Sequence, residues 1–151
     1  MTFDYRQGLS GHRGTGANMS VVKVSWSAYR ETLYPLIVQT QQRNQHQFAD
    51  DIDDALSNGS AFLFVGEDGF FVLEPKADQR GNVRVTILFA FNWGGQAIDR
   101  YQKTVEKLTR EIGGRALDVY TKVSGLTPLL TQQGWQLVEV LEGIEHWEKT
   151  L

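Results

Sequence analysis

Residues 83–114 combine a strand, a glycine turn and a helix, and this combination limits the fold more than any other feature of the chain. Apolar and other side chains alternate over Val83–Phe91, and a period of two predicts a β-strand. From Ala97 onward the spacing becomes that of an amphipathic helix. Its apolar stripe contains Ala97, Ile98, Tyr101, Val105, Leu108 and Ile112. Gly113 and Gly114 then supply the left-handed residue that commonly ends a helix.

The turn between this strand and this helix is a candidate anion site. Gly94 and Gly95 lie at the start of the predicted helix, where backbone N–H groups are unpaired and the helix dipole is positive. Dinucleotide-binding folds begin in a similar way, but their three-glycine fingerprint is absent from this sequence. A tight strand-to-helix turn also needs glycine for steric reasons alone. Two interpretations therefore stay open, an anion-binding loop and a purely structural turn.

The composition is that of a single domain with a core of its own. The chain has 151 residues, of which 41% are hydrophobic and 22% are charged. The formal net charge is -3 and Lys and Arg form no block, so a nucleic-acid partner is not expected. No apolar run approaches the roughly 20 residues of a membrane span, and no hydrophobic signal core is visible. Cysteine is absent, which fits a reducing compartment, and the expected location is cytoplasmic, without export by a signal peptide.

Residues 1–18 differ in composition from the rest of the chain. Four glycines lie among polar residues there, and the segment has little to bury. We expect a flexible, glycine-rich arm at 1–18 and a single folded domain at 19–151. Phe3, Tyr5 and Leu9 are the large hydrophobic side chains of the arm. If the arm becomes ordered, the expected partner is another protein subunit that buries these three side chains.

The remaining pattern alternates short strands with helices. Along the chain it predicts the order β-α-α-β-β-β-α-β-α-β-β, with the Val83–Phe91 strand at the centre of the sheet. The predicted class is α/β in the broad sense (α+β), with a mixed central sheet flanked by helices. Pro35 is expected to kink or break the first helix, and Glu74–Asn82 to form a polar loop.

Four carboxylates lie on the second predicted helix. Asp50, Asp51, Asp53 and Asp54 could suggest a metal site. Negative charge is favourable near a helix N-terminus, so we interpret these side chains as a solvated face. The three histidines have no metal-ligand spacing either, and no metal site is expected.

Two short motifs and the order of elements resemble the GNAT acyltransferase superfamily. Asn92-x-x-Gly95-x-Ala97 is similar to the Q/R-x-x-G-x-G/A motif of that family, with Asn92 in place of Gln or Arg. Gly134-Trp135 resembles the G-F/W pair that opens the sixth strand. The likeness covers about seven-eighths of the chain. It is closest to GNAT-like proteins of tailed phages, and it implies a GNAT-like sheet that opens beside its central strand.

The resemblance also implies a cofactor and the residues that hold it. Members of the superfamily bind acetyl-CoA or another acyl-CoA, with the pyrophosphate on the glycine turn and the pantetheine arm along the preceding strand. The corresponding positions here are Phe91, Asn92, Trp93, Gly94, Gly95, Gln96 and Ala97. The other substrate would be a small-molecule or protein amine.

The catalytic residues of the superfamily are only partly matched. Many members use a glutamate near the central strands as general base, and a tyrosine four residues before the G-F/W glycine as general acid. That tyrosine position is Leu130 in this chain. Glu74, at the end of the strand that precedes the central one, is the nearby candidate base, and Tyr120 is the candidate acid.

Two functions follow from this pattern. The first is an acyl-CoA-dependent N-acyltransferase, either active or catalytically degenerate. The second is a non-catalytic GNAT-fold protein with a structural or virion-associated role in a tailed phage, located in the virion and bound to other subunits. The glycine turn favours the first function, whereas the poorly matched acid and base and the glycine-rich arm favour the second.

Overall fold

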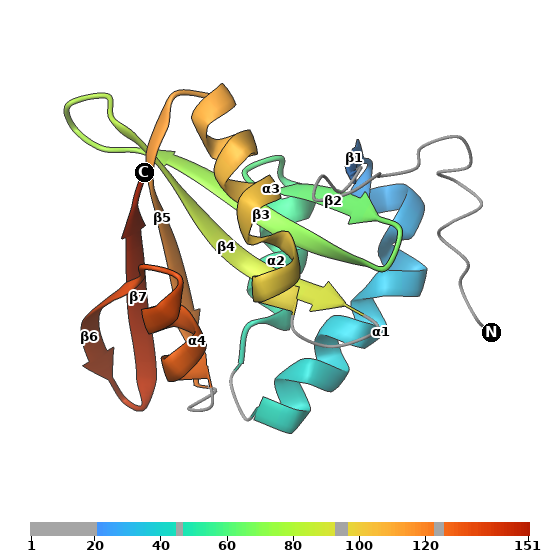
Figure 1. The fold of residues 1–151 in the computed structure, drawn as a ribbon. Coiled ribbons are helices and arrows are strands. Elements are labelled where there is room, and N and C mark those ends of the chain that lie inside the picture. The colour runs from blue at the N-terminus through green and yellow to red at the C-terminus, as the bar shows by residue number, and fades with distance from the viewer. Residues whose placement is uncertain (1–20, 45–46, 93–96, 123–125) are drawn as a thin grey trace.

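One sheet with helices on both of its faces makes up the described part of the chain (Figure 1). The computed structural model describes residues 21–44, 47–92, 97–122 and 126–151. The arm expected at residues 1–18 therefore lies outside the described residues. The elements are β1 (Val21–Val24), α1 (Trp26–Asn44), α2 (Ala49–Ser57), β2 (Phe62–Gly66), β3 (Gly69–Ala77), β4 (Val83–Asn92), α3 (Ala97–Glu111), β5 (Gly114–Thr121), α4 (Thr127–Gln132), β6 (Gln136–Leu141) and β7 (Ile144–Thr150).

β4 is the middle strand of the sheet, as the sequence predicts. The strand order is β1-β2-β3-β4-β5-β7-β6. β4 and β5 run parallel, while the other neighbouring pairs are antiparallel. α3 connects β4 to β5 and provides the crossover that a parallel pair requires. The predicted order of elements and the mixed sheet with flanking helices are confirmed.

Two clusters of buried side chains hold the helices against opposite faces of the sheet. α1 and α2 cover one face, where Leu33 and Ile52 belong to the same cluster as Phe70. α3 and α4 cover the other face, where Tyr101 and Leu130 are buried. The cluster beneath α1 and α2 includes no described residue of β5, β6 or β7. On that face of the sheet, α1 and α2 therefore pack over β1 to β4, and the described residues of β5, β6 and β7 do not belong to their core.

A β-bulge in β4 divides this strand between the two layers. In the pairing with β3, Phe89 lies opposite Val72, but Ile87 lies opposite the very next β3 residue, so Leu88 has no partner across the ladder. Val85 and Ile87 are buried beneath α3, whereas Phe89 is buried beneath α1 and α2. An uninterrupted period of two would keep Ile87 and Phe89 on one face. The extra residue reverses the alternation, and one strand supplies both cores.

β3 is longer than the sequence predicts. A polar loop is expected at Glu74–Asn82, but β3 continues to Ala77. Pro75 is tolerated because the pairing of β2 with β3 ends at Leu73, so the missing N–H of Pro75 leaves no gap in that ladder. Glu74 is therefore a strand residue, paired with Thr86 of β4. This pairing gives its carboxylate a defined place on the sheet.

α1 continues through Pro35, contrary to the predicted break. A proline inside a helix costs about 3 kcal/mol, because it lacks an N–H and crowds the preceding turn. Leu33 and Ile37 lie on either side of it and are buried, and each such side chain stabilises the fold by about 1.5–3 kcal/mol. Packing against the sheet therefore outweighs the local cost of the proline.

The acidic side of α2 docks onto α1. Asp53 accepts hydrogen bonds from Trp26 Nε1 (2.8 Å) and from Nε and Nη2 of Arg30 (2.9 and 2.8 Å). Asp50 accepts a hydrogen bond from the Tyr34 hydroxyl (2.8 Å). The expectation of a simple solvated face is wrong for these two carboxylates, because α1 lies close enough to donate to them.

The contact between Asp53 and Arg30 makes stability depend on pH. The hydrogen bonds from Arg30 lower the pKa of Asp53 from 3.8 to about 2. Since the folded-state value lies below the unfolded one, stabilisation of about 1–2 kcal/mol is present above about pH 4 and is lost as the pH falls toward 2. We expect urea unfolding to show a smaller gap between wild type and Asp53→Asn at pH 3 than at pH 6. Asp54→Asn, an exposed neighbour, is the control for removing a carboxylate from α2.

The described side chains of the predicted stripe pack against the sheet except at the end of α3, while the side chains of Ala97 and Ile98 lie outside the described residues. Tyr101 and Val105 are buried, and Leu108 is half-buried. Ile112 is 53% exposed, because it follows the last residue of α3 and no longer lies over the sheet. Gly113 has a φ of 80°, which is the left-handed residue expected at this helix end.

Candidate functional site

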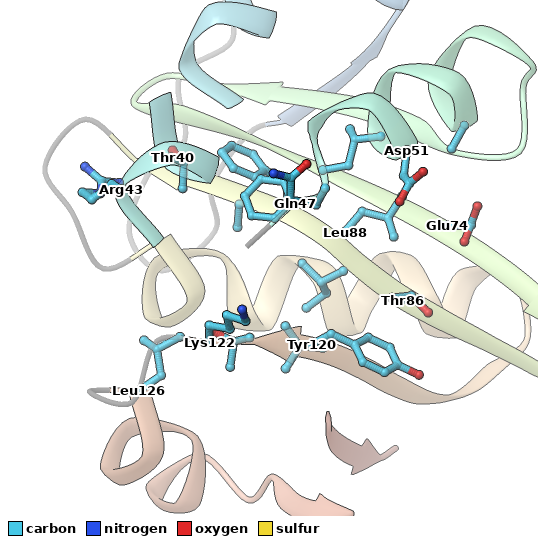
Figure 2. Close-up of a pocket in the computed structure, with 18 of the residues that line it drawn as sticks. Thr40, Arg43, Gln47, Asp51, Glu74, Thr86, Leu88, Tyr120, Lys122 and Leu126 are labelled. Carbon is cyan, nitrogen blue, oxygen red and sulfur yellow. The ribbon is translucent and has the colours of Figure 1, made fainter. Parts of the chain in front are cut away.

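A cleft opens where β4 and β5 part. Their parallel pairing ends at Ile87 and Val119, although β4 continues to Asn92 and β5 to Thr121. The bulge at Leu88 immediately follows the last pair. The cleft has a volume of about 470 Å³ and lies between these strands, the end of α1 and one side of α2 (Figure 2). This volume is in the range of pockets that bind small molecules.

Opposite charges occupy the two ends of the cleft (Figure 2). Arg43, from the last turn of α1, and Lys122, just after β5, form the cationic end. Asp51 of α2 and Glu74 of β3 form the carboxylate end. α3 begins shortly after β4 ends, so the positive end of its dipole adds to the cationic side.

Between these two ends the walls are mainly apolar. Ile52, Leu88, Phe89 and Leu126 contribute to them. Along β4, the peptide groups of residues 88–92 are not paired with β5. At residues 88–90, a strand edge that lacks this pairing can hydrogen-bond an extended ligand in the way that an added strand would.

Both catalytic candidates taken from the sequence line this cleft. Glu74 Oε2 accepts a hydrogen bond from Ser60 Oγ (3.3 Å), and its Oε1 lies 3.2 Å from Lys76 Nζ. Tyr120 is 49% exposed, and its hydroxyl lies toward the same end of the cleft as Glu74 (Figure 2). The fold thus brings together two side chains that are far apart in the sequence.

A network of polar side chains lies next to Tyr120, on β4, β5 and β7. Arg84 donates to Asp118 through Nε (3.0 Å) and Nη2 (2.9 Å), and its Nη2 also donates to Glu148 Oε2 (2.6 Å). His146 Nε2 lies 2.8 Å from Asp118 Oδ1. The rings of His146 and Tyr120 stack, with centroids 4.3 Å apart and an interplanar angle of 11°.

The charge of Asp118 determines which ring nitrogen of His146 is protonated. Burial alone would raise the pKa of Asp118, but hydrogen bonds from Arg84 and His146 outweigh it and hold the pKa below its ordinary value. The hydrogen bond between Arg84 and Asp118 also raises the pKa of Arg84. Asp118 is therefore ionised at neutral pH and can only accept hydrogen bonds. It follows that Nε2 of His146 is protonated and donates the hydrogen bond to the Asp118 carboxylate.

This network is not predicted from the sequence. Part of the signal is present, because Asp118 and Tyr120, and likewise His146 and Glu148, are two residues apart on predicted strands and so share a face. What the sequence does not show is that β5 pairs with β7 and places Tyr120 opposite His146. The charged cleft residues Arg43 and Asp51 are also missed, because their place in the cleft depends on how α1 and α2 pack against the sheet.

The predicted cofactor-binding residues are only partly described. Phe91 and Asn92 are the last two residues of β4, and Ala97 is the first residue of α3. Trp93–Gln96 lie outside the described residues. The ring of Phe91 stacks on Phe70 with centroids 5.7 Å apart, beside the core beneath α1 and α2. This side chain supports the strand behind the cleft.

The positions near the Gly-Trp pair have packing roles. Leu130, at the tyrosine position of the resemblance, is a residue of α4 and is fully buried in the same cluster as Tyr101. Trp135 is buried as well, and its Nε1 donates to Gln102 Oε1 (3.1 Å). The polar groups at the carboxylate end of the cleft therefore come from other elements, namely α2, β3 and β5.

Two kinds of feature are missing from the described ranges. No group of three or more His, Asp or Glu side chains there could hold a metal ion. Over the same part of the chain, no helix is both long enough and apolar enough to cross a membrane.

Comparison with solved structures gives a consistent fold. A GNAT-family acetyltransferase from Listeria monocytogenes matches with a TM-score of 0.59 and 14% identity, over 88% of this chain and 95% of its own. Aminoglycoside 6'-acetyltransferase type Ii gives 0.61 and 14%, over 87% and 97%. The PaiA N-acetyltransferase of Thermoplasma acidophilum, solved in complex with coenzyme A, gives 0.53 and 14%, over 89% and 99%.

These comparisons show the fold of the chain. The likeness covers most of both chains, and the mixed seven-stranded sheet with flanking helices is the GNAT fold. No family model and no curated protein matches the sequence. The structural neighbours give no support to a specific relationship with tailed phages.

Proposed function

We propose that this chain with the GNAT fold is an acyl-CoA-dependent N-acyltransferase, which transfers an acyl group from a thioester to an amine. One observation carries the proposal: where β4 and β5 part, a cleft runs from a cationic end to a carboxylate end. Positive charge attracts the phosphates of a nucleotide cofactor, and negative charge attracts an ammonium group. Solved neighbours with this fold are named as acetyltransferases, which supports the same class of reaction.

The cationic end of the cleft fits acyl-CoA. Arg43 and Lys122 would face its phosphates, together with the N–H groups of the Gly94–Ala97 turn that the sequence motif indicates. The edge of β4 at residues 88–90, which is not paired with β5, would bind the amide groups of the pantetheine arm. The cofactor would supply an activated acyl group as a thioester. The PaiA neighbour was solved in complex with coenzyme A, which supports this class of ligand.

Proton transfers would be carried out at the carboxylate end. We assign Glu74 as the acceptor of the amine proton, because its carboxylate lies in the cleft at the end opposite the cationic residues. Tyr120 would donate a proton to the departing sulfur, and its exposure allows it to regain one from water. Asp51, on the helical wall, would attract the cationic form of the amine.

The second function considered above has less support. Neither the described residues nor the solved neighbours offer an observation that favours a structural role in a tailed phage. Subunit binding through residues 1–18 stays a prediction, since this segment lies outside the described residues. We therefore retain the enzyme as the proposed function.

Isothermal titration calorimetry with acetyl-CoA tests this proposal. We expect binding with a dissociation constant of about 1 µM to 1 mM, the usual range for enzyme substrates. Arg43→Glu should weaken binding about tenfold, which is ~1.4 kcal/mol, because it reverses a charge at the cationic end. Lys107→Glu makes the same change at an exposed position of α3 and should leave the affinity unaltered. If calorimetry of the wild-type protein detects no heat of binding at millimolar acetyl-CoA, the proposal is contradicted.

A further inference from the structure

We propose that His146 is a positioning residue for Tyr120: its ring, fixed by Asp118 and Arg84, holds the tyrosine hydroxyl at the carboxylate end of the cleft. The inference rests on the proposed function, because the orientation of Tyr120 affects catalysis only if the cleft transfers an acyl group. It concerns β7, an element that contributes no residue to the lining of the cleft.

Tyr120 needs support from a neighbour to keep one orientation. Its side chain is half exposed at the edge of an open cleft, where several rotamers are sterically available. His146 lies directly opposite it in the antiparallel register of β5 and β7. The nearly parallel rings, 4.3 Å apart, leave the phenol one preferred plane. The hydroxyl is thereby directed along the cleft, toward the end that contains Glu74 (Figure 2).

The imidazole itself is held firmly. His146 Nε2 donates to Asp118 at 2.8 Å, and Asp118 receives two further hydrogen bonds from Arg84. Arg84 is fixed in turn by Glu148, the β7 residue opposite Asp118 in the register. The side chains of His146 and Asp118 are only 19% and 9% exposed. A connected series of hydrogen bonds from β4 to β7 therefore ends at the ring on which Tyr120 stacks.

This geometry favours a positioning role for His146 over proton transfer. Its Nε2 proton is committed to Asp118, and its ring does not line the cleft. The other charged groups near it on this face are Arg84, Glu148 and, from β6, Glu139, which is its partner in the β6–β7 register. The expected consequence of losing the ring is a loss of turnover through Tyr120, with little change in substrate binding.

Steady-state kinetics on the full-length chain test the inference. The substrates are acetyl-CoA and 1,4-diaminobutane, the probe amine, and the signal is the release of thiol. Tyr120→Phe should lower kcat on the order of 10²-fold, as expected for loss of a general acid. His146→Ala should lower kcat about tenfold with KM within about twofold, and the double variant should be no slower than Tyr120→Phe alone. His146→Phe retains a ring for the stack and should keep kcat within about threefold of wild type. Glu139→Gln, on β6, should not change kcat.

Proton NMR provides a readout that does not depend on activity. The Tyr120 ring should shift the His146 imidazole resonances upfield, and Tyr120→Leu should return them toward ordinary positions. His12 and His46 are internal controls in the same spectra. An unchanged His146 signal, or additive losses of kcat in the double variant, would overturn the positioning role while leaving the proposed function intact. Absence of thiol release in the presence of the ring-current shift would instead reject the proposed function, and the catalytic meaning of the stack with it.

Discussion

Replacing Phe70 by alanine is expected to lower the free energy of unfolding by about 3–5 kcal/mol, the usual cost of emptying an aromatic site in a core. Phe70 is fully buried in the cluster beneath α1 and α2. Its ring packs on Phe89, with centroids 5.5 Å apart, and on Phe91, at 5.7 Å. These two partners follow the bulge in β4, so the site cannot collapse without disturbing the strand beside the cleft. Urea denaturation followed by circular dichroism measures the loss.

Phe62→Ala is the matched control for this variant. Phe62 lies on the neighbouring strand β2 but is only half-buried, and its ring is contacted by Lys23 Nζ at 4.3 Å from the centroid. We expect a loss of about 1 kcal/mol, from a partly exposed cation–π contact and limited apolar burial. Equal losses for the two variants would show that Phe70 does not contribute to the core in the way described.

The second large effect is expected for Glu74→Gln, which should lower kcat for acyl transfer on the order of 10²–10⁴-fold. Glutamine keeps the size of the side chain and can still accept the hydrogen bond from Ser60, but it cannot take a proton from the amine. Since Glu74 lies at the end of the cleft away from Arg43 and Lys122, the affinity for acetyl-CoA should stay within a factor of about two. Thiol release gives kcat, and calorimetry gives the affinity.

Glu111→Gln serves as the control for this substitution. Glu111 is exposed at the end of α3, so its substitution by glutamine removes one negative charge away from the cleft. It should leave kcat at the wild-type value. If Glu74→Gln is as active as Glu111→Gln, then Glu74 is not the general base, and another group in the cleft has to be sought.

Local periodicity explains why the order of elements can be predicted from the sequence. The stripe of α3 around Tyr101 and Val105 and the alternation around Val85 are set by residues within one element. The predictions of a break at Pro35 and of a loop over Glu74–Asn82 are wrong for the opposite reason. Proline opposes a helix or a central strand locally, but buried neighbours in α1 and the early end of β2 remove most of that cost.

The candidate site depends more strongly on contacts between distant elements. Glu74 and Tyr120 could be nominated from the sequence with the help of a family resemblance, and both line the cleft. Asp118 could not, and the contact between Asp118 and His146 could not either, because only the pairing of β5 with β7 brings their side chains within 2.8 Å. Arg43 reaches the cleft because α1 continues through Pro35, where the sequence predicts a kink or a break.

The bulge at Leu88 has a consequence for how such a chain can change over generations. Deleting Leu88 would leave Ile87 and Phe89 adjacent and still facing opposite layers, because neighbouring residues of a regular strand alternate. Deleting Ala90 instead would turn Phe91 toward the wrong layer. The bulge is therefore a place in β4 where the chain can lose one residue without exchanging the two faces of the strand. Elsewhere in the strand, the number of residues is constrained more strictly than their identities, which is compatible with a shared fold at 14% identity.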